Sequence, residues 1–144
     1  MSIGITELQA ERLAQLARVR AAERGLGVCV AVVDGAGDLT SFIRMPGQTG
    51  AAVMVSQAKA RTSRLFACST AKLAGLPIVV GQSLLEPVVL MPGGEPLLID
   101  GIAVGAIGVS GASSADDESI AAAAAREFEN LLTQAPDGTP AGAE

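Results

Sequence analysis

Residues 100–111 read DGIAVGAIGVSG, an apolar run with glycines at positions 105, 108 and 111. Glycines inside a strand mark points where neighbouring backbone comes so close that no side chain fits. The acidic triplet Asp116, Asp117 and Glu118 follows, and negative charge suits the exposed N–H groups of a first helical turn. The stretch therefore predicts a buried strand over 102–110 under close packing, and a final helix that begins with these charges.

The N-terminal part of the chain predicts a helix and a hairpin. Thr6 has capping-box spacing to Gln9, and an apolar stripe then runs to a stop at Gly25. The β-branched run 28–33 is typical of a strand covered on both faces, and residues 38–45 alternate as a second strand would. A turn over 34–37 joins the two strands into the predicted hairpin.

The middle of the chain predicts a second long helix and two short strands. Met54, Ala58, Thr62 and Leu65 follow helical spacing, with Lys59 on another face. Strands are expected over 88–91 and 96–99, on either side of a turn at 92–95. The order α-β-β-α-β-β-β-α predicts an α+β fold with a central, mostly antiparallel five-stranded sheet packed with helices. We expect residues 1–134 to form one domain and residues 135–144 to form a disordered C-terminal tail.

The amino-acid composition excludes several classes of partner. Apolar residues make up 49% of the 144 residues, before 17 glycines are counted, and no stretch is long enough to span a membrane. This apolar fraction is higher than in most globular proteins, which favours burial of apolar side chains between subunits. We therefore expect a homo-oligomer with no membrane partner. The start lacks a signal-peptide pattern, and we therefore expect a cytoplasmic location. The net charge of −5 and an aromatic content of 2% exclude nucleic acid as a partner.

The chain contains no histidine, tyrosine or tryptophan. Histidine-based catalytic relays and histidine-ligated metals are therefore excluded, and no metal site is predicted. Cys29 and Cys68 lie on predicted buried elements, where free thiols are expected rather than a disulfide. Cys29 is expected in the core, whereas Cys68 near a helix end has some scope for reactivity.

Five motifs in order resemble the GlcG/HbpS family, which includes the C-terminal domain of PduO. They are VAVVD at 30–34, FIRM at 42–45, QAKART at 57–62, MPGG at 91–94 and GAIGVSG at 105–111. The resemblance runs from about Thr6 to Leu132. It implies an α/β domain with a central antiparallel sheet, tight oligomers, and binding of haem or another tetrapyrrole.

The cofactor implied by this resemblance has no histidine ligand available in this chain. Many members of the family carry a histidine in the hairpin turn, where this chain has Asp38. Axial ligation of haem would instead fall to Met45, Met54, Met91, a cysteine or a threonine oxygen. No cofactor is thus certain, and haem is possible by resemblance.

Four charged residues are candidates for a functional site, and each has a structural alternative. Asp34 either caps its turn or acts as a functional carboxylate. Arg44 either pairs with Asp34 or clamps a ligand carboxylate. Lys59 is either a solvated or partner-bonded charge or, if it is drawn into an apolar pocket, a base or Schiff-base amine. Glu86 lies between apolar neighbours, where a raised pKa would suit general acid–base chemistry.

Backbone positions offer further ligand contacts. Gly93 and Gly94 could present N–H groups to an anion or simply form a hairpin turn. The segment from Gly105 to Ser110 could line the floor of a pocket or serve close packing.

Two functions follow from these observations. The first is an oligomeric protein that binds a small ligand in an apolar pocket at or near a subunit interface, the ligand being a tetrapyrrole or a small organic acid. Arg44, Asp34, Gly93, Gly94 and Ser110 are its predicted ligand contacts. The alternative is a cofactor-independent isomerase, lyase or cyclase, in which Arg44 clamps an anion and Glu86 or Lys59 moves a proton.

Overall fold

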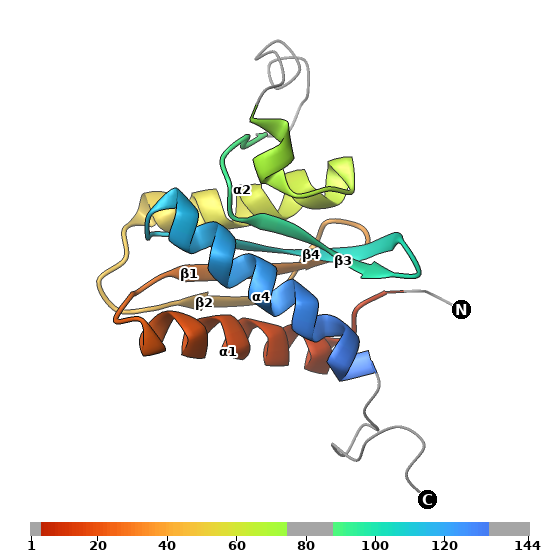
Figure 1. Ribbon diagram of the computed structural model, residues 1–144, viewed down its shortest axis with the longest axis horizontal. Helices are drawn as coiled ribbons and strands as arrows, with labels where there is room; N and C mark the ends of the chain where they lie inside the picture. Colours follow the sequence, from red (N-terminus) through yellow and green to blue (C-terminus); the bar gives the residue numbers. More distant parts are fainter. Residues whose placement is uncertain (1–3, 75–87, 133–144) are drawn as a thin grey trace, which may run out of the picture.

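A computed structural model describes residues 4–74 and 88–132 of the chain. A four-stranded antiparallel sheet, in the order β2-β1-β4-β3, lies between one helix on one face and two on the other (Figure 1). Helix α2 covers the first face, and α1 and α4 cover the second. The elements are α1 (Glu7–Glu23), β1 (Cys29–Asp34), β2 (Leu39–Arg44), α2 (Gly50–Phe66), the 3-10 helix η1 (Thr70–Leu73), β3 (Gly94–Ile99), β4 (Ile102–Ser110) and α4 (Ser114–Leu132).

The α+β class and the antiparallel sheet are confirmed, but the described residues form four strands rather than the five predicted. The strand expected over 88–91 is wrong because its backbone groups bond to side chains instead of to a neighbouring strand. The N–H of Val89 donates to the Thr62 hydroxyl at 3.0 Å, and the carbonyl of Met91 accepts from the Thr70 hydroxyl at 2.6 Å. The predicted C-terminal tail from residue 135 lies outside the described residues.

The two faces of the sheet are packed differently. Towards α1 and α4 the sheet presents large side chains, among them Val30, Leu97 and Ile107, which form the main core. Towards α2 it presents a row of small residues, because Ala31 pairs with Gly108 and Gly108 pairs with Gly94. The sheet face beneath α2 is therefore nearly flat.

The close backbone approach predicted from the glycines is confirmed. A Cβ placed on Gly108 would lie 2.1 Å from the carbonyl oxygen of Ser56, and one on Gly94 would lie 2.5 Å from that of Lys59. Real Cβ atoms do not come so near to a backbone oxygen, so the backbone of α2 rests directly on the sheet at these glycines.

The orientation of α2 follows from this flat surface. Its buried face carries mostly small or polar residues, namely Ala52, Ser56, Lys59, Ala60, Thr62 and Ser63. Met54 and Leu65 from the predicted stripe are instead 73% and 57% exposed. Lys59, expected on a different face from that stripe, points into the protein. No helix within residues 4–74 and 88–132 combines the length and the hydrophobicity that crossing a membrane requires.

Candidate functional site

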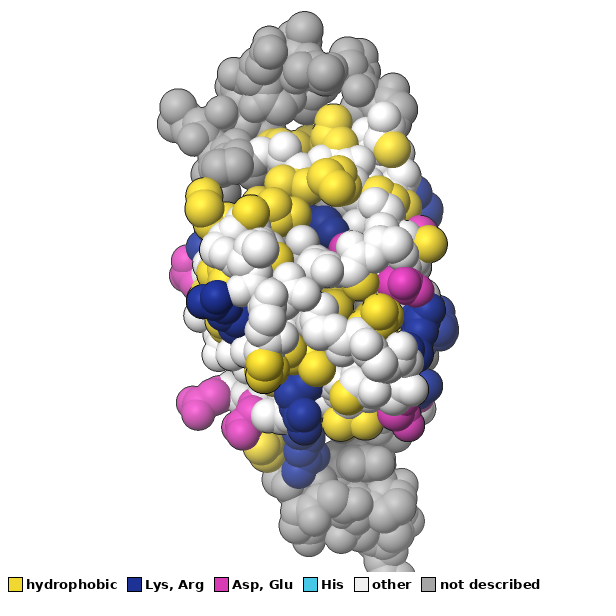
Figure 2. Space-filling model, turned by 90° about the vertical axis from the view of Figure 1, so that its left-hand side faces the viewer, with side chains coloured by type: hydrophobic (Ala, Val, Ile, Leu, Met, Phe, Trp, Pro, Cys, Tyr) yellow, Lys and Arg dark blue, Asp and Glu magenta, His cyan; other side chains and the backbone are white. Residues whose placement is uncertain are grey.

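A pocket of about 350 Å³ opens at the end of the molecule where β4 ends and both α2 and α4 begin. Figure 2 shows this end face on, with hydrophobic side chains gathered over its upper part and a small patch of blue and magenta visible between them. The lining residues are Gln48, Thr49, Ala51, Ala52, Val55, Lys59, Met91, Ser110, Gly111, Ala112, Ser114 and Asp117.

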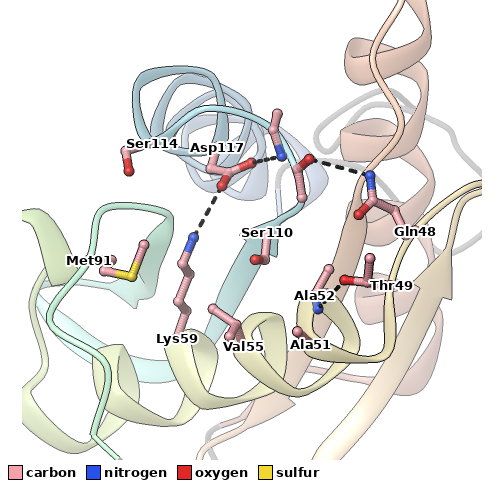
Figure 3. A pocket seen from close by; sticks show the side chains of 12 residues that line it. Gln48, Thr49, Ala51, Ala52, Val55, Lys59, Met91, Ser110, Ser114 and Asp117 are labelled. Carbon is pink, nitrogen blue, oxygen red and sulfur yellow. Dashed lines mark hydrogen bonds and ion pairs between the residues drawn. The ribbon is translucent and has the colours of Figure 1, made fainter.

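A buried ion pair forms the floor of the pocket. The Nζ of Lys59 lies 3.2 Å from Oδ2 of Asp117 and donates to the carbonyl of Val109 at 2.8 Å. The two side chains are only 1% and 5% exposed. Oδ1 of Asp117 also accepts the N–H of Ala112 at 3.0 Å. Lys59 rises from α2 towards α4, with Met91 and Ser110 on either side of it (Figure 3).

Burial moves both members of this pair towards their neutral forms. Desolvation lowers the pKa of Lys59, and the nearby Asp117 carboxylate opposes that shift. Desolvation likewise raises the pKa of Asp117, against the opposing effects of Lys59 and the Ala112 N–H. A buried lysine and a buried carboxyl with converging proton affinities can exchange a proton more readily than the same groups in water.

Ser110 is the second polar group of the pocket floor. It is the last residue of β4 and is only 8% exposed. Its hydroxyl makes no hydrogen bond to any of the residues that the structure describes, although it lines the cavity.

The structure thus brings two of the predicted site residues, Lys59 and Ser110, into one pocket. It does not bring Asp34 or Arg44 there. Oδ1 of Asp34 accepts the N–H groups of Ala36 and Asp38 at 2.9 and 3.0 Å, which is the turn-capping alternative. The guanidinium of Arg44 donates twice to the carbonyl of Gln48, at 3.1 and 2.6 Å.

The expected ion pair between Asp34 and Arg44 is wrong. Neither residue is among those that line the pocket, and each satisfies its polar atoms with backbone of its own neighbourhood. The physical reason is their position at opposite ends of the β1–β2 hairpin, where Cys29 rather than Asp34 is the partner of Arg44.

Gly93 and Gly94 are not among the residues that line the pocket, and their small size leaves space for Lys59. The N–H of Gly94 donates to the Thr70 hydroxyl at 2.9 Å, and the carbonyl of Gly93 accepts from Val109 at 2.8 Å. A Cβ on Gly93 would lie 2.7 Å from Nζ of Lys59, so a larger residue here would displace the amine. Glu86 lies outside the described residues.

Sequence reasoning placed Asp117 in a helical first turn, where it lies, but missed its role as the partner of Lys59. The two residues are 58 positions apart, and no local pattern links them. Gln48, Thr49 and Ser114 were also missed as pocket residues. Cys29 and Cys68 are both free, and burial raises the pKa of the Cys29 thiol.

The fold is similar to those of several proteins of known structure. It matches HbpS of Streptomyces reticuli, in a double-mutant crystal structure, at 30% identity over 88% of each chain with a TM-score of 0.80. It matches a PduOC:heme complex at 28% identity over 86% of this chain and 94% of the other, with a TM-score of 0.79. Klebsiella pneumoniae ORFY shares the fold, at 23% identity over 90% and 93% of the two chains with a TM-score of 0.83.

A search of curated proteins by sequence found no significant match. The sequence profile of the family described as "Haem degrading protein HbpS-like" matches residues 5–126, most of the chain. This protein is therefore a member of the HbpS-like family.

Proposed function

We propose that this protein binds a small molecule in the pocket between the starts of α2 and α4. The observation that carries the proposal is a cavity of about 350 Å³ whose floor holds a buried ion pair and the hydroxyl of Ser110, which bonds to none of the described residues. Ligand sites are typically concave, with apolar walls and a few convergent polar groups. The walls here are apolar, formed by Ala51, Ala52, Val55 and Met91.

Haem is the first ligand to consider, because the family description and the PduOC:heme complex both name it. Among the described residues of the pocket, Met91 carries the one sulfur donor, and its side chain is 51% exposed. The sulfur of Met45 instead accepts the N–H of Val28 at 3.4 Å. Thr49, a threonine oxygen at the rim, accepts the N–H of Ala52. Met91 would therefore be the residue of this pocket able to hold the haem iron through its sulfur, as a methionine does in some haem proteins.

Bound haem would supply the redox chemistry of its iron, while this chain would hold the macrocycle. The cavity lies at the small end of the range for ligand pockets. A tetrapyrrole would therefore extend beyond it, over the exposed apolar surface nearby.

That apolar surface supports a second part of the proposal. Met54 and Met91 are 73% and 51% exposed, and Leu65 further along α2 is 57% exposed. Exposed apolar patches of this kind mark interaction surfaces. We infer that copies of the chain associate through this face of α2, so that the pocket lies at or near a subunit interface.

The enzyme alternative retains one supporting observation, the desolvated Lys59 beside Asp117. A lysine with a lowered pKa can serve as a base, and the adjacent carboxyl could relay its proton. This form of the alternative no longer uses Arg44, which lies outside the pocket. It keeps the reaction class of a cofactor-independent isomerase, lyase or cyclase.

A haemin titration followed by absorption spectroscopy tests the proposal. The protein and a Met54→Leu control should both give a shifted Soret band. Met91→Leu should change the spectrum of the bound haem, and Val55→Trp should abolish binding by filling the cavity. No spectral change with the unaltered protein would exclude haem, and undiminished binding to Val55→Trp would exclude this pocket as the site.

A further inference from the structure

We propose that the pocket contains an anion subsite, formed by the converging starts of α2 and α4 and the Ser110 hydroxyl, that takes the carboxylate of a small apolar monocarboxylic acid. This inference rests on the pocket proposed above as the ligand site and names the class of its ligand.

Two helix N-termini meet at the pocket. The first N–H groups of any helix have no partner within the helix. In α2 the Thr49 hydroxyl accepts the N–H of Ala52, at 3.1 Å, and the N–H groups of Gly50 and Ala51 have no partner among the described residues. In α4 the Ser113 hydroxyl accepts only the N–H of Asp116, also at 3.1 Å.

In α4 the hydroxyl and the carbonyl of Ser113 accept the N–H groups of Asp116 and Asp117, and the N–H groups of Ser114 and Ala115 have no partner among the described residues. Ala51 and Ser114 both line the cavity. The helices are 17 and 19 residues long, so each has a developed positive end. Such ends bind anions, and here a residue from the start of each helix lines the same cavity.

Ser110 is an independent sign of a ligand. The residue is only 8% exposed and lines the cavity, and its hydroxyl has no hydrogen-bond partner among the described residues. Because no fully enclosed side-chain oxygen of the described residues lacks a partner, this hydroxyl is open to the cavity, where it can donate a hydrogen bond to a ligand oxygen.

Two of the three acidic residues at the start of α4 have a cationic partner. Asp116 forms an ion pair with Arg24, and Asp117 is neutralised by Lys59. Glu118 is not among the residues that line the pocket. Within the described lining the carboxylate and the ammonium therefore cancel, and the backbone dipoles decide the local field.

This balance favours a monoanion. Lys59 is the one cation among the described lining residues and it is already compensated, so a phosphate dianion would lack counter-charge. The apolar walls suit an alkyl or aryl body, and the cavity volume suits a short one.

Binding of hexanoate to the full chain, measured by calorimetry with amide chemical shifts as a second readout, tests the subsite. Hexanoate should bind at least about tenfold more tightly than hexanamide, the difference expected of hydrogen bonds to a charged group. The amides of Gly50, Ala51, Ser114 and Ala115 should shift. Inorganic phosphate should compete weakly.

Two matched pairs of variants separate the subsite from folding. Ala51→Glu places a negative charge in the first turn of α2, which suits the helix but should abolish hexanoate binding. Ala51→Gln has nearly the same size without the charge and should weaken binding far less. Ser110→Ala should weaken binding about tenfold, whereas Ser119→Ala, exposed on α4, should not.

Three outcomes would overturn the subsite, namely equal affinity for hexanoate and hexanamide, equal affinity of the two Ala51 variants, or phosphate binding more tightly than hexanoate. If hexanoate fails to bind while haemin binds and Val55→Trp abolishes that binding, the subsite is wrong and the pocket stands. If neither probe binds, the pocket itself is wrong.

Discussion

Breaking the buried ion pair between Lys59 and Asp117 should cost a large share of the stability of this protein. Lys59→Met leaves the Asp117 carboxylate at 5% exposure without its cation, and Asp117→Asn leaves the ammonium at 1% exposure without its anion. Removing one member of a buried pair typically costs about 3–5 kcal/mol, because the remaining charge stays desolvated. A domain is stable by only about 5–15 kcal/mol in total.

The two losses should not add. In the double variant Lys59→Met/Asp117→Asn no unpaired charge remains buried, so its loss should fall short of the sum of the single losses by about 2–3 kcal/mol. Lys72→Met, at an exposed lysine of η1, is the matched control and should change the free energy of unfolding by no more than about 0.5 kcal/mol.

Urea unfolding followed by circular dichroism is the suitable assay, since the chain has no tryptophan or tyrosine to report by fluorescence. A loss of about 3 kcal/mol should lower the urea midpoint by about 1–3 M. The reasoning is refuted if either single variant lies within about 1 kcal/mol of the unaltered protein, or if the two losses add in the double variant.

Gly108→Ala should destabilise the fold by more than about 3 kcal/mol in thermal unfolding, since its Cβ would lie 2.1 Å from a helix carbonyl. Gly50→Ala, with nothing within 4 Å, should stabilise it by about 0.4–1 kcal/mol, and the reverse order of the two would contradict the packing. Burial raises the pKa of Glu95 above its ordinary 4.5, so the folded state binds more protons than the unfolded state and the free energy of unfolding should fall as pH rises through this window. Glu95→Gln should flatten that fall in urea titrations at several pH values, and an unchanged slope would contradict it. Met54→Glu with Leu65→Glu should lower the mass measured by light scattering to that of one chain, whereas a monomeric unaltered protein would refute association through α2.

The sequence predicted the three long helices and all four observed strands because their signals are local. The capping box of Thr6 and Gln9, the β-branched run of β1 and the glycines of β4 each depend on neighbours a few positions away. The strand expected over 88–91 failed because the Thr62 and Thr70 hydroxyls take its backbone bonds. Propensity alone cannot show such long-range bonds.

The candidate site was predicted only in part. Lys59 and Ser110 were predicted as site residues, and the structure places both in the lining of one cavity. Arg44 and Asp34 were misplaced because a strand end and a turn each satisfy their charges with nearby backbone. The pairing of Lys59 with Asp117 depends on how α2 and α4 meet, which is a tertiary property.

The orientation of α2 links the opening sequence motif to both proposals. Because Gly94 and Gly108 have no side chain and Ala31 has only a methyl group, α2 approaches the sheet through its own small residues. Its large apolar side chains, Met54 and Leu65, are thereby left on the outer face. The glycines that let α2 lie directly on the sheet are thus also the reason why these apolar side chains are exposed. The same position of α2 brings its start beside that of α4, so the packing of α2 on the sheet produces both the exposed apolar face and the pocket.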